Sequence, residues 1–248
     1  MIYFTKLTKR KKYNSSAFTF LELLVVIIII GIIVATLSFN FSIDKSQIAM
    51  DNLIRDIQYA RSLALKDDKY QPFPTNTSSI EENRTKYWFK QFWQLKFGKD
   101  GNDIIYMVFS DQPAGGSTNN FDKKVITSSH TYELAKYADG RYVYGGDTYL
   151  YAGENANQDA NLSKLGIKKV ILVSEYGNKS NGYIKLLFDN FGNVFLSEGK
   201  RGDHGDTNPF DNRNILTKNA ILYLCLNINC DKNRSIIITP SGEIFSKR

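Results

Sequence analysis

The stretch FTFLELLVVIIIIGIIVATL occupies residues 18–37, and Glu22 is its only charged side chain. A helix of this length would be about 30 Å long, which is the thickness of the hydrocarbon core of a bilayer. Five basic residues and no acidic residue lie in the first 17 positions. Because basic flanks stay in the cytoplasm, the sequence predicts a membrane-inserted helix with a cytoplasmic N-terminus and the rest of the chain on the far side.

Two ordinary explanations of this segment are a cleaved secretory signal and a plain membrane anchor. A secretory signal would have a shorter apolar region with small residues at its far end, whereas residues 37–41 read LSFNF. A plain anchor leaves Glu22 unexplained, because an ionised carboxylate in an apolar helix costs several kcal/mol in lipid unless it is paired.

The segment SAFTFLELL, residues 16–24, resembles the prepilin processing motif of type IV pilins. That motif joins a short basic leader and a small residue at the cut to a Phe, and then to a Glu at the head of an apolar helix. The resemblance implies that prepilin peptidase cuts after Ala17 and methylates the new amine of Phe18. It also implies that Glu22 pairs with the amine of a neighbouring subunit. The departure from the pattern is Ala17, where the family usually has Gly, which is also small.

The helix is expected to continue beyond the apolar stretch, because no proline precedes Pro72. Apolar residues recur at helical spacing, namely at Met50, Leu53, Ile54, Ile57, Ala60 and Ala64. The sequence therefore predicts one helix from Phe18 to about Lys66, roughly 73 Å long, with an apolar stripe that faces a globular domain. Largely off that stripe we expect Asp51, Arg55, Asp56 and Lys66.

The chain after Lys66 changes to a turn-rich segment and then to runs rich in Tyr, Phe, Val and Ile, which are typical of β-strands. Strands are predicted at residues 86–97, 104–110, 123–127, 141–144, 168–174, 183–188, 193–196, 220–228 and 235–239. The predicted fold class is α+β, with a long N-terminal transmembrane helix packed on an antiparallel β-rich domain. The predicted parts are a leader (1–17), the transmembrane half of the helix (18–40), its amphipathic half (41–70) and a periplasmic domain (71–248).

Three short segments resemble the GspH/FimT family of minor pilins and pseudopilins. They are ARSLA (60–64) on the predicted helix and two glycine-containing turns, LFDNFGNV (187–194) and ITPSGEI (238–244). The middle of the chain, about 83–161, carries no recognised motif. The resemblance implies a structural subunit of a type IV pilus or type II secretion pseudopilus, processed by prepilin peptidase. The partners that it implies are other pilins and the inner membrane.

Cys225 and Cys230 have two explanations, a disulfide and a reduced pair in the core. The location outside the cytoplasm that the resemblance implies favours the disulfide, which would stabilise the fold by about 2 kcal/mol. Two loops, 98–103 and 201–206, superficially resemble calcium loops but lack the ligand number and spacing of an EF-hand, so no metal site is predicted. No catalytic or cofactor fingerprint occurs in the sequence, and we expect neither enzymatic activity nor a cofactor.

The formal net charge of +7 falls to +2 without the first 17 residues, since 27 basic residues then face 25 acidic ones. This balance does not imply a strongly basic surface for nucleic acid. The alternative function is a filament-tip binding module for DNA uptake or adhesion, as the resemblance to FimT-type proteins permits. Its candidate residues are a basic C-terminal group, Arg213, Lys218, Lys232, Arg234, Lys247 and Arg248.

Overall fold

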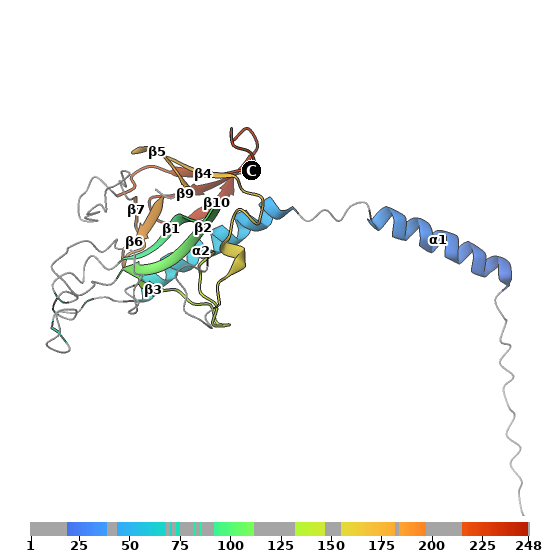
Figure 1. Cartoon of the computed structure of the whole chain (residues 1–248), viewed down its shortest axis with the longest axis horizontal. Coiled ribbons are helices and arrows are strands. Elements are labelled where there is room, and N and C mark those ends of the chain that lie inside the picture. Colours follow the sequence, from blue (N-terminus) through green and yellow to red (C-terminus); the bar gives the residue numbers. More distant parts are fainter. Residues whose placement is uncertain are drawn as a thin grey trace, which may run out of the picture. The chain divides into compact units, whose positions relative to one another are not determined.

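The computed structural model describes residues 19–38, 44–67, 70, 73–74, 82, 85, 92–111, 132–146, 155–181, 184–196 and 215–247 (Figure 1). The chain divides into two compact units, Met1–Ile43 and Asp44–Arg248. Within the described residues, the first unit contains helix α1 (Phe20–Ser38), and the second contains helix α2 (Lys45–Lys66), a short 3-10 helix (Gln158–Ala160) and two β-sheets.

Helix α1 (Phe20–Ser38) forms the described part of the first unit and has the sequence FLELLVVIIIIGIIVATLS. Its large apolar side chains from Phe20 to Val34 are exposed, with exposed fractions between 43% and 80%. Among the described residues, no helix has both the length and the apolar character needed to cross a membrane. Residues 18, 39 and 40 of the transmembrane segment predicted at 18–40 lie outside the described residues.

Helix α2 (Lys45–Lys66) begins the second unit, and Asp44 is its N-cap. Asp44 has an extended backbone (φ −73°, ψ 90°), and its carboxylate accepts hydrogen bonds from the backbone N–H groups of Ser46 and Gln47. An Asp in this position satisfies donors that the first helical turn leaves free. The prediction of one unbroken helix from Phe18 to Lys66 is therefore wrong at Asp44, where a second helix starts with its own cap.

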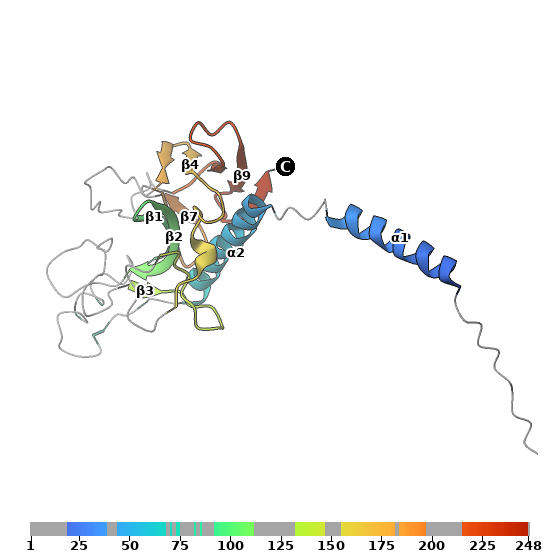
Figure 2. The same ribbon diagram turned by 45° about the vertical axis from the view of Figure 1, so that its right-hand side comes forward.

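The strands described in the second unit form two five-stranded antiparallel sheets. The first has the order β3-β2-β1-β6-β7, with β1 (Trp93–Asp100), β2 (Asp103–Asp111), β3 (Tyr132–Leu134), β6 (Lys185–Phe188) and β7 (Val194–Leu196). The second has the order β10-β9-β8-β4-β5, with β4 (Lys169–Ser174), β5 (Gly177–Ser180), β8 (Ala220–Cys225), β9 (Asn233–Ile238) and β10 (Ile244–Lys247). Helix α2 lies alongside both sheets in two views (Figures 1 and 2). The predicted α+β class and the antiparallel sheets are confirmed.

The main core lies between α2 and the two sheets. Leu53, Ile57 and Ala60 on α2 are fully buried and belong to one cluster with strand residues such as Leu95 and Leu222. The apolar stripe predicted for this helix is therefore confirmed. Burying such side chains stabilises the fold by about 1.5–3 kcal/mol for each large aliphatic residue.

A smaller cluster covers the other face of β2. Because side chains alternate along a strand, Ile105, Met107 and Phe109 point away from the main core and pack with Tyr142 and Tyr144. The covering segment is bonded to β2 through its backbone, since Gly145 N–H donates to the carbonyl of Tyr106 over 3.1 Å. Part of the middle region that carries no motif thus covers the outer face of the first sheet.

Most predicted strands within the described residues are confirmed, with boundaries shifted by a few residues. The exception is 141–144, where the residues form isolated bridges and no continuous strand. The predicted strand at 123–127 and the start of the one at 86–97 lie outside the described residues. Three edge strands, β3, β5 and β10, were not predicted from the sequence.

Candidate functional site at the start of the apolar helix

The first turn of α1 is closed by hydrogen bonds between Thr19 and Glu22. The Glu22 carboxylate oxygen Oε2 accepts from the Thr19 backbone N–H at 2.8 Å and from the Thr19 hydroxyl at 2.9 Å. In return, the backbone N–H of Glu22 donates to Thr19 Oγ1 at 3.3 Å. This reciprocal pattern is a capping box, and the sequence Thr-x-x-Glu at the head of an apolar run is its signature.

The cap fixes where the Glu22 carboxylate lies. One oxygen, Oε2, accepts both hydrogen bonds from Thr19, while Oε1 accepts no hydrogen bond from the described residues. The carboxylate also lies at the positive end of the helix dipole. Chemically, the arrangement offers a fixed anionic oxygen that can receive a cationic donor such as an amine.

The predicted cleavage and methylation residues, Ala17 and Phe18, lie outside the described residues. Thr19, the first described residue, directly follows the predicted new N-terminus at Phe18. Cleavage after Ala17, methylation of Phe18 and pairing of Glu22 with a neighbour's amine therefore remain predictions.

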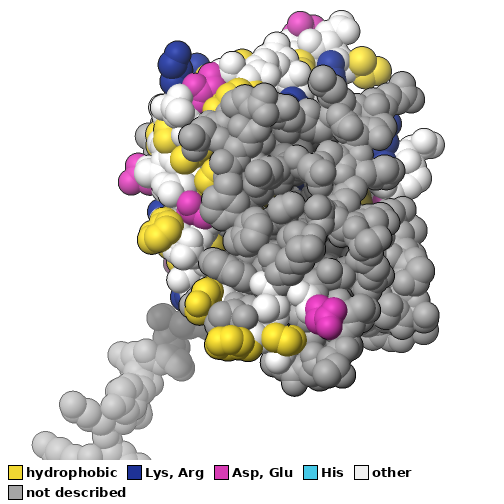
Figure 3. All heavy atoms as spheres, turned by 90° about the vertical axis from the view of Figure 1, so that its left-hand side faces the viewer, with side chains coloured by type: hydrophobic (Ala, Val, Ile, Leu, Met, Phe, Trp, Pro, Cys, Tyr) yellow, Lys and Arg dark blue, Asp and Glu magenta, His cyan; other side chains and the backbone are white. Residues whose placement is uncertain are grey.

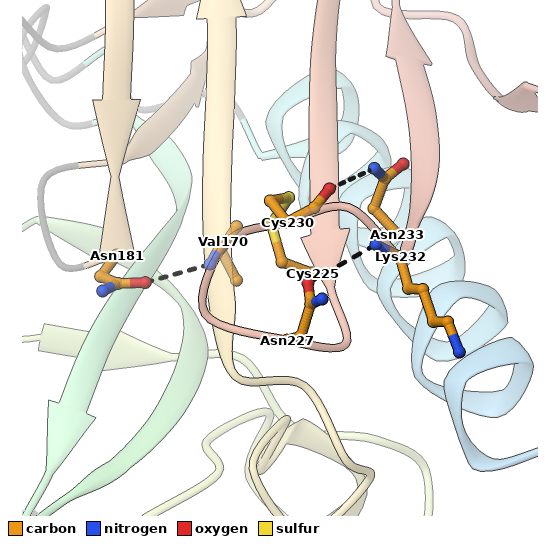
Figure 4. Close-up of a disulfide and its surroundings, with 7 residues drawn as sticks. All are labelled: Val170, Asn181, Cys225, Asn227, Cys230, Lys232 and Asn233. Carbon is orange, nitrogen blue, oxygen red and sulfur yellow. Dashed lines mark hydrogen bonds between the residues drawn. A yellow bond between two sulfur atoms is a disulfide. The ribbon is translucent and has the colours of Figure 1, made fainter.

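The structure joins Cys225 and Cys230 in a disulfide, as the sequence predicts. The bond closes the loop between β8 and β9 (Figure 4). Backbone bonds brace the same loop: Leu226 N–H donates to the Lys232 carbonyl at 2.8 Å, and Cys230 N–H donates to the Asn227 carbonyl at 3.2 Å. The Asn233 side-chain amide adds a bond to the Cys230 carbonyl at 2.8 Å. The disulfide thus holds a tight hairpin connection between β8 and β9.

Arg61, in the ARSLA segment of α2, brings together the three segments that resemble the GspH/FimT family. Its Nη2 donates to the Ser241 carbonyl at 2.9 Å, and its Nε donates to the Gly192 carbonyl at 3.3 Å. Gly192 and Gly242 lie in the two turns and have φ values of +82° and +78°. A Cβ at Gly242 would lie 2.5 Å from Arg61 Nε. These glycines therefore let the turns close around the guanidinium, and the role of Arg61 here is structural.

The basic residues proposed for DNA binding do not gather in one place. Arg213 lies outside the described residues. Arg234 is already paired, because its guanidinium binds Asp44 Oδ2 and its Nε donates to Ser46 Oγ at 3.2 Å. Lys218 lies just before the start of β8, and Lys232 lies just before β9, next to the end of β8. The two lysines are therefore at opposite ends of the β8-β9 pair. Lys218 therefore lies apart from Lys232 and Arg234, and DNA binding by these residues stays a prediction.

One face of the molecule agrees with this distribution. In Figure 3 the described Lys and Arg side chains lie around the margin of the view, and acidic side chains lie among them. Non-specific DNA binding depends on several basic side chains that contact phosphates together. The described surface in this view shows no such grouping.

From the sequence, Asp56 is expected largely off the apolar stripe, but its carboxylate is buried. Asp56 is fully buried and accepts hydrogen bonds from Tyr106 at 2.7 Å, Tyr137 at 2.6 Å and Arg55 Nε at 2.9 Å. Burial raises the pKa of both tyrosines, and the Asp56 carboxylate raises it further. Asp56 lies three residues after Leu53 and four before Ala60, so helical spacing does place it on the stripe.

A cavity of about 380 Å³ opens beside this network. Its lining consists of Arg55, Tyr137, Ala138, Asp139, Arg141, Asn157 and Asp159. Both arginines already have acidic partners, since Arg55 binds Asp56 and Arg141 binds Asp139 at 2.7 Å. The lining thus carries charges that are largely balanced within the protein. Within the described part of the chain, no three His, Cys, Asp or Glu side chains come together as metal ligands.

Comparison with known proteins identifies the N-terminal segment. A family model described as the prokaryotic N-terminal methylation motif matches residues 12–38, which include Ala17, Phe18 and Glu22. The chain has no significant match among curated proteins or among solved structures. The match covers the leader and the apolar helix but not the β-domain. This chain is therefore type IV pilin-like at its N-terminus, where it carries the methylation motif of a prepilin.

Proposed function

We propose that this chain is a minor pilin or pseudopilin, a structural subunit of a type IV pilus or of a type II secretion pseudopilus. The observation that carries the proposal is the match of residues 12–38 to the methylation motif, a stretch that includes Phe18 and Glu22. Prepilin peptidase cuts the leader after Ala17 on the cytoplasmic side and methylates the amine of Phe18.

Helix α1 anchors the subunit in the inner membrane before assembly and then packs with other pilin helices. Its exposed apolar side chains support this role, because an apolar surface of this size in water marks a contact with lipid or protein. The basic leader supports a cytoplasmic N-terminus, which leaves the domain from Asp44 onward in the periplasm. The disulfide between Cys225 and Cys230 fits that oxidising compartment.

The β-domain is of the GspH/FimT kind in this proposal. The support is that Arg61 of ARSLA contacts both turns of the other two resembling segments. Such a domain has a filament-forming role and needs no catalytic residue or cofactor. The alternative role in DNA uptake or adhesion has less support from its candidate residues, since Arg234 is paired with Asp44 and Lys218 lies at the opposite end of the β8-β9 pair from Lys232.

Two substitutions of Glu22 test the assembly role and separate it from helix capping. Glu22→Gln keeps a capping box, because Gln can replace Glu in it, but removes the negative charge. Glu22→Ala removes both. If the carboxylate pairs with a neighbour's amine, both variants insert and are cleaved, yet neither is cross-linked to other pilins in cells.

The matched control is Thr19→Ser, which retains a capping hydroxyl and the charge and is expected to assemble. Normal cross-linking of Glu22→Gln, together with loss in Glu22→Ala, would mean that capping alone matters. Normal cross-linking of both variants would contradict the proposed role of Glu22.

A further inference from the structure

One end of the β10-β9-β8-β4-β5 sheet gathers lysine residues that are far apart in the sequence. The register pairs Lys169 with Cys225, Cys225 with Asn233 and Lys247 with Ser235. Lys168 donates its backbone N–H to the Cys225 carbonyl at 2.8 Å. Since neighbouring strands lie about 4.8 Å apart, the row from β4 to β10 is roughly 14 Å wide.

The N-terminus of α2 lies at the same end of this sheet. Arg234 on β9 binds Asp44 and Ser46, the two residues that flank Lys45. Lys45 therefore lies beside the N-terminal end of β9, where the disulfide loop joins this strand. We call Lys45, Lys168, Lys232 and Lys247 the basic end.

These four lysines are exposed. None forms an ion pair with an acidic side chain within the described part of the chain. The neighbouring acids offset little of this charge, because Asp44 is neutralised by Arg234 and Asp231 is a single exposed carboxylate. The basic end thus carries a net positive charge over a short distance, which attracts an anionic surface and weakens as salt rises.

An apolar side chain projects from the same end. Ile228 lies in the loop closed by the disulfide, and 78% of its surface is exposed. The disulfide and the hydrogen bonds of Asn227 and Asn233 brace this loop, with Lys232 at its base (Figure 4). A fixed apolar tip among lysines suits the interface of a bilayer, where headgroups are charged and the boundary below them is apolar.

The chain also enters the domain at this end. Within the basic end, Lys45 is the residue nearest to α1 along the chain, since only residues 39–44 separate it from Ser38.

We propose that the basic end and Ile228 dock the β-domain on the anionic phospholipid surface of the membrane before assembly. This inference rests on the proposed anchoring of α1. The lysines bind phosphate headgroups, as basic segments next to membrane anchors do, and Ile228 enters the interface. The docked contact orients the domain relative to the bilayer and is released when the subunit leaves the membrane.

The test uses the full chain reconstituted in vesicles that contain bromine-labelled phospholipid as a quencher of tryptophan fluorescence. Ile228→Trp places a reporter at the basic end. Phe191→Trp is the matched control, because Phe191 is also highly exposed, at 76%, but lies in the turn held by Arg61. Arg61 is 16 residues beyond Lys45 on α2, about 24 Å along the helix. The unsubstituted chain gives the background from its native tryptophans.

The expected result is strong quenching of Ile228→Trp in vesicles with phosphatidylglycerol and little quenching of Phe191→Trp. Quenching is lost in high salt, in phosphatidylcholine alone, and when all four lysines of the basic end are changed to Gln. Changing Lys66 and Lys218 to Gln instead leaves it intact.

Absence of Ile228→Trp quenching in anionic vesicles would overturn the docking, as would quenching that persists without the four lysines. Alkaline extraction of the vesicles separates this result from the anchoring. A chain that stays with the vesicles but shows no quenching refutes the docking alone. A chain that is released contradicts the anchoring and overturns the docking with it.

Discussion

Arg61 donates a hydrogen bond from Nη2 to the main-chain carbonyl of Ser241, 2.9 Å away and 180 residues later in the sequence. The same guanidinium reaches the Gly192 carbonyl. One side chain of α2 therefore fixes two turns, one from each sheet. A guanidinium can do this because it presents several donors in a rigid plane.

The first prediction concerns the close packing at Gly242. Gly242→Ala should destabilise the domain, because the new Cβ would lie 2.5 Å from both Arg61 Nε and the Gly192 carbonyl oxygen. The backbone at φ +78° adds strain of roughly 1–3 kcal/mol. Gly140→Ala is the control, since Gly140 has φ +84° and open space around it. Urea unfolding of the full chain should show a larger loss for Gly242→Ala, and equal losses would contradict the packing argument.

The second prediction concerns the buried Asp56. Asp56→Ala leaves the hydroxyl of Tyr106 and the guanidinium of Arg55 without their shared acceptor. Leaving the buried Tyr106 hydroxyl without an acceptor costs about 1–3 kcal/mol, whereas the half-exposed Arg55 side chain can bind water instead. Asp51→Ala on the exposed side of α2 is the matched control, with an expected change within about 0.5 kcal/mol. Equal unfolding free energies for the two variants would show that the hydrogen-bond network of Asp56 does not contribute to stability.

The third prediction concerns pH and Asp44. Hydrogen bonds from Ser46 and Gln47, with a smaller effect of Arg234, lower the pKa of Asp44 below its usual 3.8. The stabilisation by the Asp44 carboxylate is therefore complete at pH values above its usual pKa. It is lost as the pH falls through the lower pKa that Asp44 has in the folded protein. Asp44→Asn keeps a good N-cap but removes the charge.

Unfolding free energies of the wild type and Asp44→Asn, measured against pH, check this prediction. The wild type should be more stable near neutral pH, and the difference should shrink in acid. A difference that stays constant down to strongly acidic pH would exclude the charge of Asp44 as its cause.

The fold was largely predictable where local patterns carry the information. The α2 stripe follows from helical spacing at Leu53, Ile57 and Ala60, and strands such as β2 and β8 follow from apolar runs. The missed strands lack that signal. Strand β5 reads GNKS and lies at a sheet edge, where pairing with β4 creates the strand without any apolar pattern.

The less predictable features depend on contacts between distant residues. At Asp44 the side chain caps a new helix, and this cap takes the place of a continuous helix. The sequence Asp-x-Ser is only a weak signal of a helix start within a long helical pattern. Pairing of Arg234 with Asp44 joins residues 190 positions apart, so no local pattern around Arg234 indicates that its guanidinium is already paired. The Thr19–Glu22 cap, in contrast, has a readable local signature, which sequence reasoning treated only as part of the processing motif.

The most direct test of the central claim is mass spectrometry of the N-terminus of the membrane-associated chain from cells with an active prepilin peptidase. We expect a mature chain that lacks the first 17 residues and begins with N-methylated Phe18. Cells without the peptidase should yield the unprocessed chain, which serves as the control. An unprocessed N-terminus at Met1 in cells whose peptidase processes other pilins would contradict the claim that this chain is a processed pilin-like subunit.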